Sequence, residues 1–116
     1  MKRIALFVGL AVLLLGCSKQ KSQTLGTKFD GVPIPVSKAR EAAPETVIIL
    51  HGTMTKKCPV AGCWFFLQDD TGTIKVDTKN SGFVVVDVPL NSTLTVAGRI
   101  GTNEAGRFLD ATGLRY

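Results

Sequence analysis

The chain of 116 residues contains the side-chain types that bind soft metal ions: three cysteines, one histidine and two methionines. Cys58 and Cys63 stand close together, and His51 and Met54 precede them by a few residues. Because thiolate, thioether and imidazole groups suit copper and zinc, these four residues form a candidate copper or zinc site. No other cofactor is expected.

Cys58 and Cys63 have two further interpretations. A disulfide between them would close a loop of residues 58–63 and would stabilise the folded chain by roughly 2 kcal/mol in the chain-entropy model. A free or redox-active pair is the third option, although thiol pairs of the thioredoxin type have the spacing Cys-x-x-Cys at the start of a helix. Of the three, the sequence favours a structural disulfide.

The polar residues do not form a catalytic constellation. Asp69 and Asp70 belong to a predicted turn, and the other carboxylates are scattered. A Ser-His-Asp arrangement cannot be assembled around the single histidine, and the chain has no glycine loop of the phosphate-binding type. We therefore expect no enzymatic activity.

The elements that position these residues are predicted from the period of the apolar residues, which becomes two from Thr46 onward. Asp69-Asp70-Thr71-Gly72 has the composition of a tight turn. Five short strands, with a longer insertion between the third and the fourth, are typical of the OB-fold, an all-β five-stranded Greek-key barrel. The predicted strands are residues 46–55, 63–69, 73–77, 93–100 and 107–113.

Strand alternation predicts which side chains face the barrel interior. Even positions from Ile48 to Met54 and odd positions from Cys63 to Leu67 face inward, whereas His51, Trp64 and Phe66 face outward. The predicted register has four cross-strand pairs: Leu50 with Leu67, Gly52 with Phe65, Met54 with Cys63, and His51 with Phe66. His51 then lies about 10 Å along the strand from Cys63, which leaves Met54, Cys58 and Cys63 as a sulfur-only set for Cu(I).

The N-terminal segment has the layout of an export signal. Lys2 and Arg3 precede an uncharged apolar run over residues 4–15, which is shorter than the roughly 20 residues that span a bilayer. The ending Leu14-Leu15-Gly16-Cys17 resembles the bacterial lipoprotein signal, and this resemblance implies cleavage before Cys17 and lipid attachment to its sulfur. The alternative is an ordinary secretory signal with a chance cysteine. Ser18 after the cysteine implies the outer membrane over the inner one, if the cell has two membranes.

Between the signal and the barrel we expect a tether and a short helix. Residues 17–28 are predicted to be a flexible lipidated tether, and residues 29–116 the folded domain, so that residues 1–16 are the signal peptide. Ser37 is the predicted N-cap of a helix that continues to Ala43. Residues 29–36 contain two prolines and are expected to be extended and to lie against the domain.

The charge of the chain argues against nucleic acid as a partner. The net charge is +5, but residues 45–116 contain seven basic and seven acidic side chains. The excess positive charge lies in the signal and in residues 18–44. Most nucleic-acid affinity comes from neutralised phosphates, so a neutral domain is a poor candidate.

Several motifs resemble known OB-fold domains. Leu67-Gln68-Asp69-Asp70-Thr71-Gly72-Thr73-Ile74 resembles the hairpin of the anticodon-binding modules of aminoacyl-tRNA synthetases, and Leu50-x-Gly52-x-Met54 and residues 96–100 resemble their first and fourth strands. A narrower likeness joins Cys58-Pro-Val-Ala-Gly62-Cys63-Trp64 and Gly82-Phe83 to a family of exported bacterial OB-like domains of unknown function. The likeness covers residues 29–116 and implies a fold, not an activity.

Trp64 and Phe66, with Lys75 on the next strand, stand where OB-fold domains stack bases or sugars. These three residues are the candidate ligand-binding site. The alternative, which the sequence favours, is that residues 32–36 fold back and cover the two rings. We expect a periplasm-facing, lipid-anchored binding or assembly module that contacts the membrane through its lipid and has an envelope protein as a candidate partner.

Overall fold

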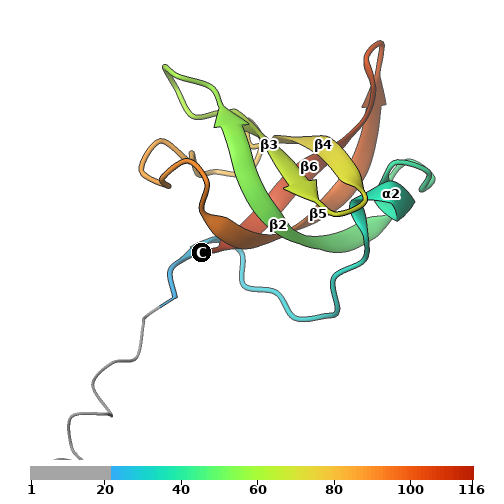
Figure 1. Ribbon diagram of the computed structural model, residues 1–116, viewed down its shortest axis with the longest axis horizontal. Helices are drawn as coiled ribbons and strands as arrows, with labels where there is room; N and C mark the ends of the chain where they lie inside the picture. Colours follow the sequence, from blue (N-terminus) through green and yellow to red (C-terminus); the bar gives the residue numbers. More distant parts are fainter. Residues whose placement is uncertain (1–21) are drawn as a thin grey trace, which may run out of the picture.

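Five long strands curl into a closed barrel in the computed structural model, which describes residues 22–116 (Figure 1). A three-residue strand and a single-turn helix precede them. The elements in chain order are β1 (Thr24–Gly26), α2 (Val36–Ala39), β2 (Val47–Lys57), β3 (Trp64–Asp69), β4 (Gly72–Asp77), β5 (Thr93–Asn103) and β6 (Gly106–Arg115). The all-β prediction and the positions of its five strands are confirmed to within a few residues at each end.

The strand pairings close the barrel. Neighbours around the ring are β6, β4, β3, β2 and β5, and β5 pairs back onto β6. The contact between β4 and β6 is parallel, and the other pairings are antiparallel. The segment between β4 and β5 crosses one end of the barrel without regular structure. This is the five-stranded closed barrel expected of an OB-fold.

Alternation along the strands places the core inside the ring, as predicted. Leu50 and Met54 of β2 and Phe65 and Leu67 of β3 are completely buried. The cluster also takes one or more apolar side chains from each of the other barrel strands and from α2. Burial of apolar surface is the main favourable term in folding, so the inward-facing residues hold the barrel together.

The predicted register between the first two strands is wrong. Leu67 pairs with Met54 instead of Leu50, Phe66 pairs with Lys56, and a bulge at Thr55 shifts the register between them. The cause is that β2 continues to Lys57, which shortens the connecting loop and moves the pairing by about four residues. His51 consequently pairs with Thr95 of β5 and not with Phe66.

The short helix α2 is capped by a distant turn. The Ser37 side chain does not act as the N-cap, and the helix ends at Ala39, so the predicted bounds are wrong. Instead, the Val36 N–H donates to Asp69 Oδ2 at 2.9 Å, and the Ser37 N–H donates to Thr71 Oγ1 at 2.9 Å. The β3–β4 turn therefore satisfies the backbone donors that open the helix.

The N-terminal part of the described chain is tied to the barrel. Strand β1 lies within the predicted tether and pairs with the end of β6, so the ordered domain begins earlier than residue 29. Residues 31–34 lie along the outside of β2, where the Ile34 N–H donates to the Ile49 carbonyl at 2.9 Å. This segment covers the Ile49 side chain, and the expectation that it would cover Trp64 and Phe66 is wrong.

The predicted signal peptide and Cys17 lie outside the described residues. Among residues 22–116 the structure contains no helix long and apolar enough to cross a membrane.

Candidate ligand-binding face

Trp64 and Phe66 lie side by side on the outer surface of the barrel. They are alternate residues of β3, and both remain partly exposed while Phe65 between them is buried. Their ring centroids are 5.6 Å apart, with an angle of 42° between the ring planes. Two aromatic faces in contact on a strand form a rigid surface on which a planar or ring-bearing ligand can stack.

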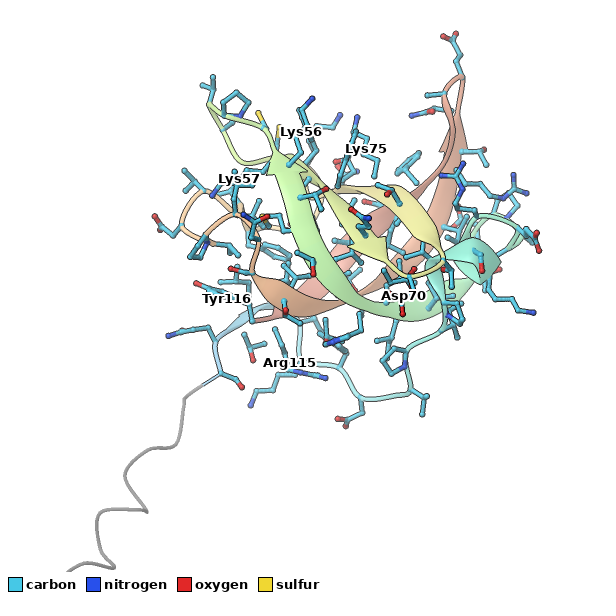
Figure 2. All side chains as sticks on the ribbon, in the orientation of Figure 1. Lys56, Lys57, Asp70, Lys75, Arg115 and Tyr116 are labelled. Atoms are coloured by element: carbon cyan, nitrogen blue, oxygen red, sulfur yellow. The ribbon has the colours of Figure 1, made fainter. Side chains whose placement is uncertain are left out.

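Two lysines from the flanking strands lie over these rings. The Lys56 ammonium of β2 is 5.9 Å from the Phe66 centroid, and the Lys75 ammonium of β4 is 5.6 Å from the Trp64 centroid. Figure 2 shows both lysines at the same end of the barrel. An ammonium near an aromatic face is attracted by the ring quadrupole, so the cations and the rings form one unit.

A cavity of about 340 Å³ continues this surface toward α2 and the β5–β6 hairpin. Phe66 and Lys75 form one wall of the cavity, and Phe108 of β6, which pairs with Lys75, forms another. The Phe108 ring rests on Gly101, where a Cβ atom would lie 2.5 Å from the ring. Gly101 thus lets a third aromatic ring lie flat against the sheet beside the first two.

Two arginines border the same cavity. Arg40 Nη1 donates to the Thr73 carbonyl at 2.8 Å, and Arg107 Nε donates to the Ala42 carbonyl at 2.5 Å. Asp77, a nearby acidic residue, pairs with Lys79 at 3.5 Å. We define the ligand face as the rings and cations described above: Arg40, Lys56, Trp64, Phe66, Lys75, Arg107 and Phe108. This face is locally basic although the domain as a whole is neutral.

Cys58 and Cys63 flank the loop that leads into Trp64, and both are free thiols with partly exposed side chains. Hydrogen bonds from the backbone N–H groups of Ala61 and Val60 lower the pKa of the Cys58 thiol to about 7. Burial raises the pKa of Cys63, and a hydrogen bond with the Cys58 side chain raises it further. The pKa values of the two thiols are therefore shifted in opposite directions.

Lys57 holds the neighbouring loop by its ammonium group. This group donates to the carbonyls of Val85, Val86 and Val88 at 3.3, 3.0 and 2.5 Å. Figure 2 shows Lys57 and Lys56 at the end of β2. Adjacent residues of one strand point to opposite sides, so Lys56 contributes to the ligand face while Lys57 is structural.

The predicted four-residue metal site is not assembled. Met54 is completely buried in the core, and His51 Nδ1 is 2.9 Å from Thr95 Oγ1 on the outer surface of β2. The inward orientation predicted for Met54 is confirmed, and its sulfur lies in the barrel core, whereas Cys58 and Cys63 are partly exposed in the loop after β2. Within residues 22–116, no group of three or more His, Cys, Asp or Glu side chains is placed to hold a metal ion.

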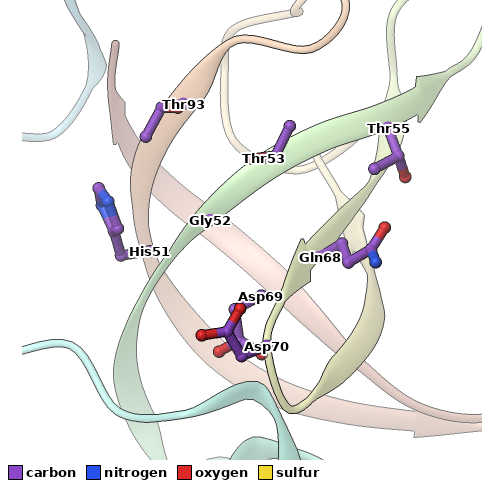
Figure 3. A pocket seen from close by; sticks show the side chains of 8 residues that line it. All are labelled: His51, Gly52, Thr53, Thr55, Gln68, Asp69, Asp70 and Thr93. Carbon is purple, nitrogen blue, oxygen red and sulfur yellow. The ribbon is translucent and has the colours of Figure 1, made fainter.

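His51 instead borders a polar cavity of about 510 Å³ where β2 diverges from β3 (Figure 3). The figure shows Asp69 and Asp70 across this cavity from the histidine. The Asp69 carboxylate is fully engaged with Val36, Thr71 and Gly72. The lining of this cavity is polar and includes no tryptophan, phenylalanine, lysine or arginine, so we place the candidate site on the other side of β3.

The sequence profile of the bacterial OB-fold (BOF) proteins matches residues 16–115. The chain belongs to the bacterial OB-fold family. A relative is the calcium-regulated OB-fold protein CarO of Pseudomonas aeruginosa, which is 28% identical over 75 residues, or 65% of this chain. The matched region spans 63% of that protein, somewhat less than two thirds of its length.

The solved structure of the hypothetical protein ygiW from E. coli has the same fold. It superposes with a TM-score of 0.59 and 19% identity, covering 72% of this chain and 88% of the other. The family membership confirms the predicted OB-fold relationship. The lipid signal and the Cys-x₄-Cys-Trp motif remain predictions from the sequence.

Sequence reasoning grouped Trp64, Phe66 and Lys75 correctly but missed four members of the ligand face: Arg40, Lys56, Arg107 and Phe108. Phe108 had a recognisable signal, because its alternation with Leu109 places it outside the barrel on a strand beside β4. No local sequence pattern indicated that Lys56 belongs to the ligand face, because its position depends on the bulge at Thr55.

Proposed function

We propose that this protein is a non-catalytic, lipid-anchored binding module of the cell envelope that binds an acidic oligosaccharide on its ligand face. The observation that carries the proposal is the contact between Trp64 and Phe66 with a lysine ammonium over each ring. Sugar rings and acidic groups are complementary to aromatic faces flanked by cations, and OB-folds bind oligosaccharides on the corresponding strands.

The two arginines beside the cavity extend the positive charge across β3, β4 and β6, in the direction in which the bound oligosaccharide would lie. Single-stranded nucleic acid could use the same chemistry, but the domain beyond residue 44 has no net positive charge with which to attract a polyphosphate. We therefore favour a ligand with fewer and more widely spaced charges.

Trp64 is the only tryptophan of the chain, so its fluorescence reports directly on the ligand face. In a titration at low salt with a size-defined hyaluronan oligosaccharide, which has one carboxylate per disaccharide, we expect a saturable change in Trp64 emission. Phe66→Ala removes one stacking ring and should weaken binding about tenfold, because base or sugar stacking on a ring is worth about 1–3 kcal/mol. Lys75→Gln should weaken binding and reduce its salt dependence.

Lys38→Gln is the matched charge control, because Lys38 is exposed on α2 and does not border the cavity. The proposal is wrong if this variant loses as much affinity as Lys75→Gln, or if a neutral oligosaccharide of equal length binds as tightly. Preferential binding of single-stranded DNA would favour the nucleic-acid function instead.

The anchoring part of the proposal rests on Leu14-Leu15-Gly16-Cys17. We expect the unchanged protein in the membrane fraction with acyl mass on its N-terminal cysteine. Cys17→Ala should abolish the acyl mass and give precursor or soluble protein, since membrane binding scales with the number of buried methylene groups. Membrane retention of Cys17→Ala at the normal level, without precursor, would show that the lipid is not the anchor.

A further inference from the structure

Cys58 and Cys63 face each other across the short loop between β2 and β3. The Cys58 N–H donates to the Trp64 carbonyl at 3.0 Å, which brings the two ends of the loop together. The Cys63 side chain is hydrogen-bonded to the Cys58 side chain. The two thiols therefore stand at the two ends of one short loop that is closed by a backbone hydrogen bond.

The loop is fixed from one side by the segment after β4. The Gly62 carbonyl accepts hydrogen bonds from the Val85 N–H at 2.9 Å and from Thr78 Oγ1 at 3.2 Å, and the Cys63 carbonyl accepts one from the Thr78 N–H at 2.9 Å. Gly62 has a φ of +62°, and a Cβ atom there would lie 2.6 Å from the Val86 nitrogen. The backbone of Gly62 and Cys63 is therefore held in place.

The turn directs several backbone N–H groups at the sulfur of Cys58, whereas the sulfur of Cys63 receives the N–H of Cys63 itself. The N–H groups of Ala61, Val60, Cys63 and Gly62 all stabilise a negative charge on Cys58. Such a ring of amides binds an anion without a charged side chain. Burial keeps Cys63 protonated, and the charged side chain that faces it is Lys79. Lys57 is turned away toward the carbonyls of Val85, Val86 and Val88.

A cavity of about 360 Å³ lies against Cys63 and is bordered by Thr78, Lys79, Phe83 and Val84, among others. Its walls combine apolar side chains with one ammonium group. The Cys63 side chain is therefore accessible from this cavity.

We propose that Cys58 and Cys63 form a thiol–disulfide exchange site whose substrate is an organic disulfide, with Cys58 as the attacking thiolate and Cys63 as the resolving thiol. Cys58 Sγ attacks one sulfur of the substrate, so that its S–S bond breaks and one thiolate leaves. Cys63 loses its proton to water or to the departing thiolate and attacks Cys58 Sγ, which releases the second half of the substrate. One disulfide is consumed, two thiols are released, and the chain gains a Cys58–Cys63 bond.

The experiment uses the full chain in detergent with Cys17→Ser in every variant, so that the pair provides the only thiols. The probe is glutathione disulfide. Samples are quenched with acid, and the mass of the intact protein is measured by mass spectrometry. The parent chain should lose two hydrogens without retaining glutathione. Cys63→Ser should retain one glutathione, because the attacking thiolate remains and the resolving thiol is gone.

Cys58→Ser should react at least about fivefold more slowly at pH 7 than Cys63→Ser. Burial, the main cause of the raised pKa of Cys63, persists in this variant and leaves a small thiolate fraction, which the higher nucleophilicity of that thiolate only partly offsets. Circular dichroism of each variant shows whether the barrel is intact.

The pH dependence of the parent chain provides a test that requires no substitution of the pair. The rate should rise with pH through a midpoint near 7. Equal rates for the two serine variants, glutathione retained on the parent chain, or a midpoint of about 8.5 or higher would each overturn the proposal. The ligand face is tested by Trp64 fluorescence, and the thiol pair is tested by the mass of the protein. Either proposal can therefore fail while the other stands.

Discussion

The free energy of unfolding of the Phe65→Ala variant is expected to be about 3–5 kcal/mol lower than that of the unchanged protein. The Phe65 ring is completely buried on the inner side of β3, where side chains from opposite walls of the barrel meet. Its removal loses the transfer free energy of the ring and leaves a cavity that a closed sheet can collapse into only partly. Urea denaturation followed by circular dichroism measures the change.

Phe66→Ala is the matched control, because the same residue type at the next position of the same strand lies on the outer surface. Phe66→Ala should lower the free energy of unfolding by less than about 1.5 kcal/mol, because the Phe66 ring is already partly exposed to water in the folded state. The Phe66 variant is expected to lose ligand affinity and the Phe65 variant to lose stability. Equal destabilisation by the two substitutions would contradict the observed division between core and surface.

The Asp69→Asn chain is expected to be less stable by about 2 kcal/mol at pH 7, because charged hydrogen-bond acceptors contribute more than neutral ones. Burial on its own would raise the pKa of Asp69. The hydrogen bonds from the Thr71 side chain and from the backbone of Val36, Thr71 and Gly72 outweigh burial and lower the pKa below its usual value. The carboxylate holds both the β3–β4 turn and the start of α2.

The stabilisation by Asp69 depends on pH in a direction that follows from this lowered pKa. An aspartate with a depressed folded-state pKa stabilises the protein fully above its unfolded-state value of about 3.9, and this contribution disappears as the pH falls through the folded-state value. The difference between Asp69→Asn and the unchanged chain should therefore be constant above pH 5 and shrink below pH 4. Asp70→Asn, in the same turn, is the control at pH 7 and should change stability little, because Asp70 is exposed.

The sequence was sufficient to predict the barrel because the period of two continues through all five long strands. Inward-facing positions such as Leu50 and Leu67 could be assigned from alternation alone, and this part of the prediction is confirmed. Register was not predictable in the same way. Every shift by an even number of residues keeps the same side chains inside, so the pattern does not distinguish Leu50 from Met54 as the partner of Leu67.

The bulge at Thr55 and the cap of α2 depend on contacts between distant residues. The first requires β2 to continue through Lys56 and Lys57, and lysine is a residue type that is depleted in strands. The second requires Asp69 to lie beside Val36, 33 positions away in the chain. Neither interaction leaves a local signal, which explains why the predicted helix started and ended at the wrong residues.

The candidate ligand face was predictable in part for the same reason. Trp64, Phe66 and Lys75 lie on two strands joined by a recognisable tight turn, so their proximity follows from local sequence. Arg40 and Arg107 reach the face only because α2 and the β5–β6 hairpin converge at one end of the barrel. Met54 was associated with Cys63 through the predicted register, and that register is wrong because Met54 pairs with Leu67.

Strand β1 brings the two ends of the described part of the chain, residues 22–116, together. Gln23 and Tyr116 exchange two backbone hydrogen bonds, of 2.8 and 3.0 Å. A short linker from Tyr116 to Gln23 would therefore give a continuous ring of polypeptide, and new ends could be opened in the exposed turn between Asn103 and Gly106. The barrel is thus a suitable template for circular permutation, in which the order of its strands along the gene changes while their neighbours in space stay the same.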